Sequence, residues 1–230
     1  TISGLPFSTD YRVRAYAVNI DGTSYGETVQ TATLIYTPGQ RGVFGGGYSA
    51  TSVMDYITIS TAGNALDFGD LTLARYNLTA CSSSTRGVFG GGQTTNVIDY
   101  ITIATPGNAT DFGDLTLARY YLAACSSSTR GVFGGGYGAA TYNNIDYITI
   151  ATPGNAVDFG DLTAAREGAS AYLAACSSST RGVFGGGYTT VAVNNVDYIT
   201  IATTGNASDF GDLTLARYGL AACSDGHGGL

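Results

Sequence analysis

The chain has 230 residues and a formal net charge of −7, and all ten of its basic residues are arginine. Charged residues make up 12% and hydrophobic residues 44%, so the chain can bury a core while carrying few surface charges. The acidic balance argues against a nucleic-acid or anionic-membrane partner, because both require basic patches. No apolar run approaches the roughly 18 residues that a spanning helix needs, so we expect no membrane insertion.

Residues 1–35 form a module that differs in sequence from the rest of the chain. The stretch from Gly4 to Tyr11, followed by alternating residues at 12–19, resembles the second half of a fibronectin type III domain. The resemblance implies a tyrosine corner at Tyr11 and a hairpin turn at 20–23. About three strands cannot bury a sandwich core, and the chain begins without Met, so we expect the missing half upstream in a longer protein.

Residues 36–230 contain a fourfold repeat with a period of about 45 residues, which is typical of repeat architectures. The string Arg-Gly-Val-Phe-Gly-Gly-Gly starts at Arg41, Arg86, Arg130 and Arg181. An Asp-Tyr strand follows at Asp55, Asp99, Asp146 and Asp197, and then Asp-Phe-Gly-Asp, with its Phe at Phe68, Phe112, Phe159 and Phe210. Each copy ends with an Ala-Arg step and a small-residue segment that contains Cys81, Cys125, Cys176 or Cys223.

Within a repeat, the local signals are those of strands. Residues 56–59 are β-branched or aromatic, and Gly63-Asn64 ends the run as turn residues do. Gly45-Gly46-Gly47 marks a point where the backbone turns or another element approaches closely. No segment carries a helical apolar period of useful length. The sequence therefore predicts an all-β fold with four short strands per repeat, the proportion of a propeller blade.

The repeat unit resembles the kelch motif. Leu117-Ala118-Arg119 leads to the strand at 132–135, and Asn144-Ile145-Asp146-Tyr147 and Asp158-Phe159 supply the later strands. The kelch family usually has Trp at its last aromatic position, where this chain has Phe. The resemblance implies a β-propeller with one blade per repeat.

Four copies imply a four-bladed ring with a specific closure. The first copy lacks an Ala-Arg…Cys strand before Arg41, whereas the last copy ends with one. We therefore expect Ala216–Cys223 to pair with Arg41–Gly47 and to seal the sheet edges. The alternative is that these residues form half of a larger ring, completed by a second chain.

The four cysteines occupy equivalent positions on the predicted inner strands. One interpretation is a four-thiolate metal site on the axis, formed by Cys81, Cys125, Cys176 and Cys223, because Zn²⁺ favours tetrahedral sulfur ligation. The favoured interpretation is that these are small buried residues beside Ala, since Cys-x-x-Cys spacing is absent. We therefore expect no metal and no other cofactor.

The remaining chemistry-bearing residues do not indicate an enzyme. The Asp-Phe-Gly tripeptides lack the Lys that a kinase requires, and their aspartates are better explained as turn caps or as exposed partners of Arg than as calcium ligands. His227 is the only histidine, and the Ser82-Ser83-Ser84 copies have no base nearby. Galactose oxidase also has kelch-like repeats, but its copper site needs two His, and this chain has only one.

The repeats differ most in the loops that follow the glycine triplets, at 48–54, 93–98, 137–145 and 188–196, and in an insertion at 167–172. Variable loops on a rigid scaffold are where recognition usually resides, and these are rich in Tyr, Thr and Asn. The candidate binding residues are Tyr48, Gln93, Tyr137, Tyr142, Tyr172 and Tyr188. The alternative, loops that have drifted without any ligand, stays open.

The whole composition resembles that of phage virion appendages, such as tail or capsid fibres, and of bacterial surface adhesins. The resemblance implies an extracellular or virion-surface location, a host glycan or protein as ligand, and other appendage subunits as partners. A kelch-type protein-interaction scaffold is the competing class. Whether the chain forms a homo-oligomer is left open.

Overall fold

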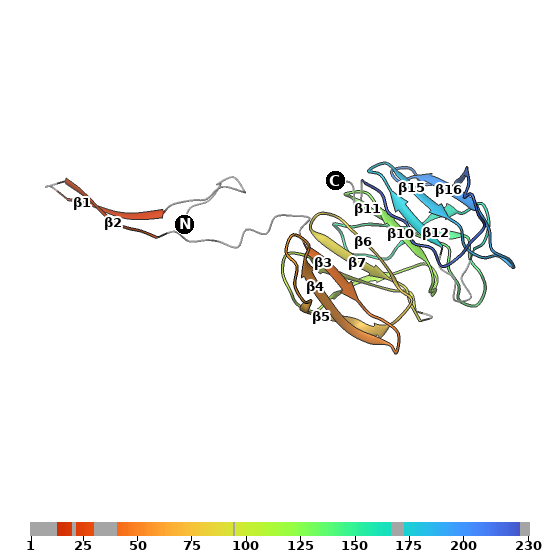
Figure 1. Ribbon diagram of the computed structural model, residues 1–230, viewed down its shortest axis with the longest axis horizontal. Helices are drawn as coiled ribbons and strands as arrows, with labels where there is room; N and C mark the ends of the chain where they lie inside the picture. Colours follow the sequence, from red (N-terminus) through yellow and green to blue (C-terminus); the bar gives the residue numbers. More distant parts are fainter. Residues whose placement is uncertain (1–12, 20–21, 30–40, 94, 167–172, 226–230) are drawn as a thin grey trace. The chain divides into compact units, whose positions relative to one another are not determined.

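The computed structural model describes residues 13–19, 22–29, 41–93, 95–166 and 173–225. The chain divides into two compact units, Thr1–Gln40 and Arg41–Leu230. Every regular element of the described residues is a strand, so none of them forms a helix that could cross a membrane. The predicted all-β class is therefore confirmed (Figure 1).

The described residues of the first unit, 13–19 and 22–29, form one antiparallel strand pair. Strand β1 (Val13–Asn19) pairs with β2 (Gly22–Val29), with Asn19 opposite Gly22 and a register shift between Arg14 and Tyr16. A shift of this kind is a β-bulge, which increases the local twist of a strand pair. Tyr11, the residue of the predicted tyrosine corner, lies outside the described residues.

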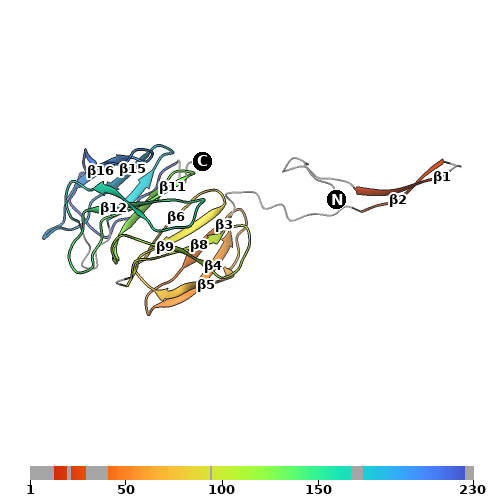
Figure 2. The ribbon, with the colours of Figure 1, turned by 180° about the vertical axis from the view of Figure 1, so that it is seen from behind.

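The second unit consists of four antiparallel sheets in chain order (Figures 1 and 2). Sheet I has three strands: β3 (Arg41–Gly45), β4 (Thr51–Thr58) and β5 (Leu66–Arg75). Sheet II contains β6 (Thr79–Ser82), β7 (Arg86–Gly90), β8 (Val97–Thr102) and β9 (Thr110–Asp114). Sheet III contains β10 (Ala123–Ser126), β11 (Arg130–Gly134), β12 (Asn144–Thr149) and β13 (Val157–Asp161). Sheet IV contains β14 (Ala174–Ser177), β15 (Arg181–Gly185), β16 (Asn195–Thr200) and β17 (Ser208–Asp212). Sheets II to IV confirm the prediction of four strands per repeat.

The repeated sequence produces a repeated register. Val88 lies opposite Tyr100 in sheet II, as Val132 lies opposite Tyr147 in sheet III. The third and fourth strands of sheet II shift register after Ile98, and sheets III and IV shift at the equivalent position. Because side chains alternate along a strand, this common register sends the same repeat positions to the same face in every sheet.

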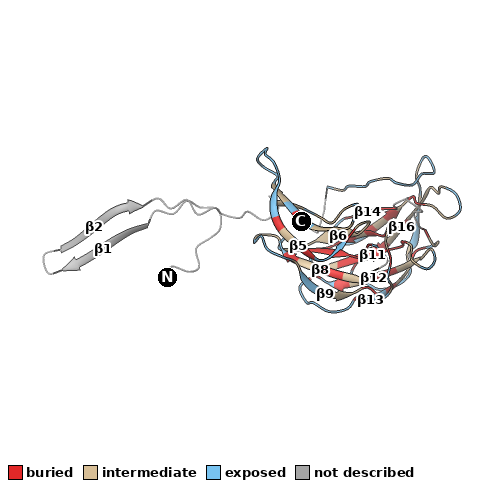
Figure 3. Ribbon diagram, turned by 90° about the horizontal axis from the view of Figure 1, so that it is seen from below, coloured by how far each residue is buried: buried red, intermediate tan, exposed pale blue. Residues whose placement is uncertain are grey.

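The core lies between successive sheets. One cluster joins Phe68 and Leu71 of sheet I to Phe89 and Ile101 of sheet II. Equivalent clusters join sheet II to sheet III and sheet III to sheet IV. Figure 3 shows the buried residues along the middle strands of the sheets, with exposed residues towards the loops. The sheets therefore depend on one another for burial, as stacked repeats do.

Among the described residues, no strand pairing joins the two ends of the array. In the described part of the chain, β3 pairs only with β4, and residues 218–224 form no strand. The structure thus does not show the expected pairing of Ala216–Cys223 with Arg41–Gly47, and the closed ring stays a prediction. Phe210 of sheet IV is 55% exposed, whereas its equivalent Phe159 is 2% exposed.

Candidate functional site

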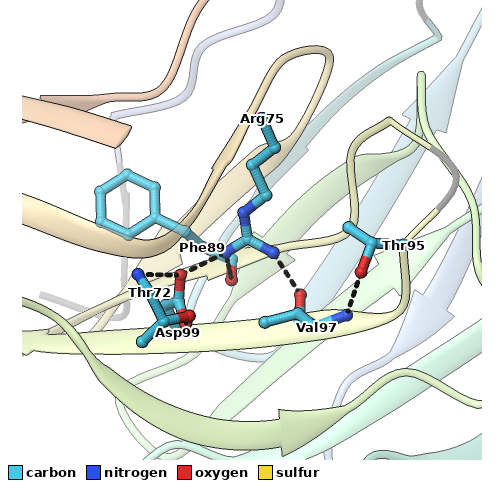
Figure 4. A network of polar contacts seen from close by, with 6 residues as sticks. All are labelled: Thr72, Arg75, Phe89, Thr95, Val97 and Asp99. Atoms are coloured by element: carbon cyan, nitrogen blue, oxygen red, sulfur yellow. Dashed lines mark hydrogen bonds and ion pairs between the residues drawn. The ribbon is translucent and has the colours of Figure 1, made fainter. Parts of the chain in front are cut away.

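An arginine that lies at the end of a repeat enters the interface with the next sheet and is wholly buried there (Figure 4). Arg75 is the Arg of the Ala-Arg step at the end of sheet I, and it forms an ion pair with Asp99 of sheet II at 2.7 Å. The same guanidinium donates hydrogen bonds to the carbonyl oxygens of Val97 (2.6 Å) and Phe89 (3.3 Å). The backbone N–H of Thr72 also donates to the Asp99 carboxylate, at 3.3 Å.

This network recurs at the other two internal interfaces. Arg119 pairs with Asp146 at 2.9 Å, Arg166 pairs with Asp197, and all four side chains are 0% exposed. Burial lowers the pKa of each of these arginines, and the facing carboxylate partly offsets that effect. These pairs use the Asp of the Asp-Tyr strand and not the Asp-Phe-Gly aspartates, for which we expected exposed Arg partners. The packing of neighbouring sheets removes them from water. A feature repeated at each interface is best read as scaffold.

The buried arginines also fix where the loops leave the sheets. The Arg119 carbonyl accepts a hydrogen bond from the N–H of Gly92 at 3.0 Å, and Gly91 and Gly92 have φ angles of 67° and 98°. A Cβ on Gly91 would lie 2.5 Å from the Arg119 oxygen. Only glycine tolerates both the left-handed backbone and that approach. The glycine triplet therefore turns the chain off the sheet and directs the following loop.

The structure places five of the six predicted binding residues in these loops. Tyr48 is 91% exposed and Gln93 is exposed, whereas Tyr137, Tyr142 and Tyr188 are partly buried. Tyr172 lies outside the described residues. Tyr142 packs on its own loop, since a Cβ on Gly138 would lie 3.0 Å from the Tyr142 ring.

Further tyrosines join the loop residues into a continuous set of contacts. The rings of Tyr48 and Tyr76 meet edge to face with centroids 6.0 Å apart, and the Tyr76 carbonyl accepts from the Gln93 N–H at 3.1 Å. Tyr120 and Tyr137 exchange two backbone hydrogen bonds of 2.9 Å, and their rings lie 5.6 Å apart.

Tyr121 and Asn77, which directly follow Tyr120 and Tyr76 in the sequence, connect these two groups of contacts. Tyr121 contacts the Tyr120 ring at 4.7 Å, and its N–H donates to the carbonyl of Asn77 at 3.1 Å. We call these residues the tyrosine band: Tyr48, Tyr76, Gln93, Tyr120, Tyr121 and Tyr137. The band crosses sheets I to III, and Tyr188 forms a separate pair with Tyr218 on sheet IV at 5.5 Å.

Sequence reasoning missed Tyr76, Tyr120, Tyr121 and Tyr218. The signal was present, because a tyrosine directly follows the Ala-Arg step in three of the four repeats. Tyr76, Tyr120 and Tyr218 belong to the repeat, so the loops where the repeats differ do not point to them. Tyr121 replaces the Asn77 of the first repeat.

The cysteine segments line a cavity of about 340 Å³, together with Ala and Ser of β6, β10 and β14 and with Ala222. Two of the thiols pack against a glycine of the next sheet. The Cys81 sulfur lies 2.8 Å from the position of a Cβ on Gly131, and Cys125 lies at 2.6 Å from that on Gly182. Burial raises the pKa of Cys81 to about 12 and also raises that of Cys125. These thiols fill space between neighbouring sheets.

The other candidate residues have structural contacts. The carboxylate of Asp67 accepts from the N–H of Gly69 at 3.2 Å, the Asx cap that the sequence predicts. The hydroxyl of Ser83 accepts from the N–H of Arg86 at 3.2 Å. Among the described residues, no group of three or more His, Cys, Asp or Glu side chains could hold a metal ion. His227 lies outside those residues.

The arrangement therefore offers aromatic faces, amides and hydroxyls at the loop end of a packed scaffold. Comparison with known proteins adds no relative: no family model matches the chain, and no curated protein sequence matches it.

Proposed function

We propose that this chain is a non-enzymatic structural and recognition module of an extracellular or virion appendage, such as a phage tail or capsid fibre. It binds a host surface glycan or protein receptor through the loops that follow the glycine triplets. Its other partners are further subunits of the appendage.

In this proposal the four sheets are the blades of a kelch-like four-bladed propeller. The first unit is the C-terminal part of a fibronectin type III-like domain. The fourfold register and the core between successive sheets support the propeller, because blades pack face to face in this way. The hairpin of β1 and β2 is compatible with part of a sandwich.

The observation that carries the function is the tyrosine band. Tyrosine supplies a large contact area at a low cost in conformational entropy, with an apolar ring and a polar hydroxyl. Sugar rings present the matching combination of C–H faces and hydroxyl groups. The band lies on elements held by the buried Arg–Asp network, so its residues are positioned before a ligand arrives.

A glycan array and a panel of intact bacterial cells test this proposal. We expect the chain to bind at least one glycan or cell type. The double variant Tyr48→Ala/Tyr137→Ala should lose at least about tenfold in affinity, because it removes two stacking contacts of roughly 1 kcal/mol each. The matched control is Val157→Ser, which changes a 54% exposed residue of the outer strand β13.

Two results would count against the proposal. One is no binding to any glycan or cell, and the other is binding that the double variant leaves unchanged. Binding to an isolated protein alone would favour a kelch-type interaction scaffold. Tail or capsid genes beside the complete gene would indicate a virion, whereas secretion genes would indicate an adhesin.

A further inference from the structure

Each internal sheet interface is built from the same polar contacts. The Arg and Thr at the end of one sheet bind the Asp of the next: Arg75 and Thr72 with Asp99, Arg119 and Thr116 with Asp146, Arg166 and Thr163 with Asp197. The remaining members of this set are Arg217 and Thr214 of the last repeat and Asp55 of the first. Arg217, Thr214 and Asp55 are exposed. The chain thus contains both halves of a fourth interface.

Within the described ranges, the apolar contacts between sheets also leave one Gly and one Phe without their equivalent partners. A Phe of each following sheet covers a Gly of the preceding one, and the Phe133 ring lies 2.7 Å from the position of a Cβ on Gly90. Phe89 covers Gly45 and Phe184 covers Gly134 in the same manner. In sheet IV no aromatic ring of the described residues covers Gly185, whereas Phe44 of sheet I is 60% exposed.

The outer strands repeat this pattern. The side-chain oxygen of Asn108 in sheet II accepts from the N–H of Asp70 in sheet I at 3.1 Å, and the two later sheet pairs have equivalent bonds. The corresponding donor in sheet IV is the N–H of Asp212, and the corresponding acceptor in sheet I is Asn64. No described atom lies within 4 Å of a Cβ position on Gly211, next to Asp212.

Sheet I also leaves room for an inner strand. A cavity of about 240 Å³ lies between β3 and β6, lined by residues that include Val43 and Gly87. In the later sheets the cysteine of an inner strand packs on a glycine of the next sheet, as Cys81 does on Gly131. No cysteine takes that position at Gly87, and Cys223 is exposed. The register of β10 on β11 predicts Cys223 opposite Val43, as Cys125 lies opposite Val132.

Residues 222–224 contact the inner strand of sheet IV in the way that each earlier inner strand contacts the one before it. The Ser224 hydroxyl donates to the Ser177 carbonyl at 2.6 Å, as Ser177 donates to Ser126 at 2.8 Å. Ala222 lines the same 340 Å³ cavity as β6, β10 and β14. The first inner strand and the last segment therefore border one cavity, which favours a ring within one chain over a wider ring shared between chains.

We propose that residues Leu213–Ser224 form a latch that binds sheet I of the same chain through a complete fourth interface. Arg217 and Thr214 bind Asp55, Phe44 covers Gly185, and Cys223 fills the slot over Gly87. This inference rests on the four-bladed fold proposed above and extends it from one strand pair to a buried ion-pair network that joins the two ends of the array.

Disulfide trapping in the full chain tests the latch. In a background with Cys81→Ala and Cys176→Ala, we expect Val43→Cys to form a disulfide with Cys223 under mild oxidation. Neighbouring antiparallel strands bring Cα atoms to about 4.5–5.5 Å, which a disulfide can bridge. The matched positive control is Val132→Cys, which faces Cys125 in the observed pair of β10 and β11. Val43→Ser is the negative control.

Peptide mapping and intact mass distinguish the outcomes. A bond between position 43 and Cys223 within one chain supports the latch. A bond between two chains would overturn the latch in favour of a second copy. The latch would also be overturned if position 43 formed no bond while the Val132→Cys control did.

Alkylation of the unmodified chain gives a second readout that needs no variant. We expect iodoacetamide to modify Cys223 at least about tenfold more slowly in the folded chain than in urea, because a packed thiol is shielded. Modification at the rate of the unfolded chain would overturn the latch. Glycan and cell binding is measured on the same samples, so a failed latch with intact binding is distinguished from a failed function.

Discussion

The sheet interfaces and the loop end of this protein are made from the same repeats but obey different constraints. At the interfaces, Arg119 and Asp146 are wholly buried, and equivalent residues take equivalent positions in the neighbouring sheets. At the loop end, the residue after the glycine triplet is Tyr in three repeats and Gln in one, and Tyr48 is 91% exposed.

The difference shows what burial requires of a sequence. A buried guanidinium needs a carboxylate and several carbonyl oxygens in fixed positions, so one residue cannot change without the others. An exposed tyrosine has water as its alternative partner, so its position accepts other side chains. Substitutions at the interfaces should therefore affect stability, whereas substitutions at the loops should affect binding.

The largest expected effect is that of Arg119→Gln. This substitution leaves Asp146 buried without its counter-charge and removes the donor to the Asn144 carbonyl. We expect a loss of about 3–5 kcal/mol in the free energy of unfolding, measured by chemical denaturation. The control is Arg181→Gln, since Arg181 is exposed and stacks on Tyr198 at 4.5 Å, a contact that contributes about 0.5–1 kcal/mol. Equal losses in both variants would contradict the comparison.

A smaller effect is expected for Gly90→Ala. The added methyl group would lie 2.7 Å from the ring of Phe133, which is 0% exposed and cannot move into solvent. Overpacking of this kind costs about 1–3 kcal/mol. Phe133→Leu in the same chain should recover part of the loss, and a double-mutant cycle measures that coupling. Purely additive losses would show that the two residues do not share the interface.

Much of the scaffold could be predicted because the sequence repeats. The four glycine triplets and four Asp-Tyr strands indicated the all-β class and four strands per repeat, and sheets II to IV have them. The buried Arg–Asp pairs could not be predicted in the same way. Arg75 and Asp99 lie in different repeats, and only the packing of one sheet on the next removes them from water.

The candidate site was predicted less completely, for a physical reason. Loop variability directed attention to Tyr48, Tyr137 and Tyr188, but variability carries no information about which residues lie beside them. Tyr76 and Tyr120 reach the loops because the buried arginines directly before them fix the chain there.

The smallest effect on stability and the largest on binding should come from a loop exchange. Replacing residues 137–143 with the four residues 93–96 of sheet II removes Tyr137 and its contact with Tyr120, and leaves Asn144 and the Arg119 network in place. The affinity of this exchanged chain for the cells or glycans that the parent binds is the most direct test of the account. We expect the exchanged chain to bind at least about tenfold more weakly than the parent, with a free energy of unfolding within about 1 kcal/mol of the parent's. An unchanged affinity would contradict the proposed role of the loops.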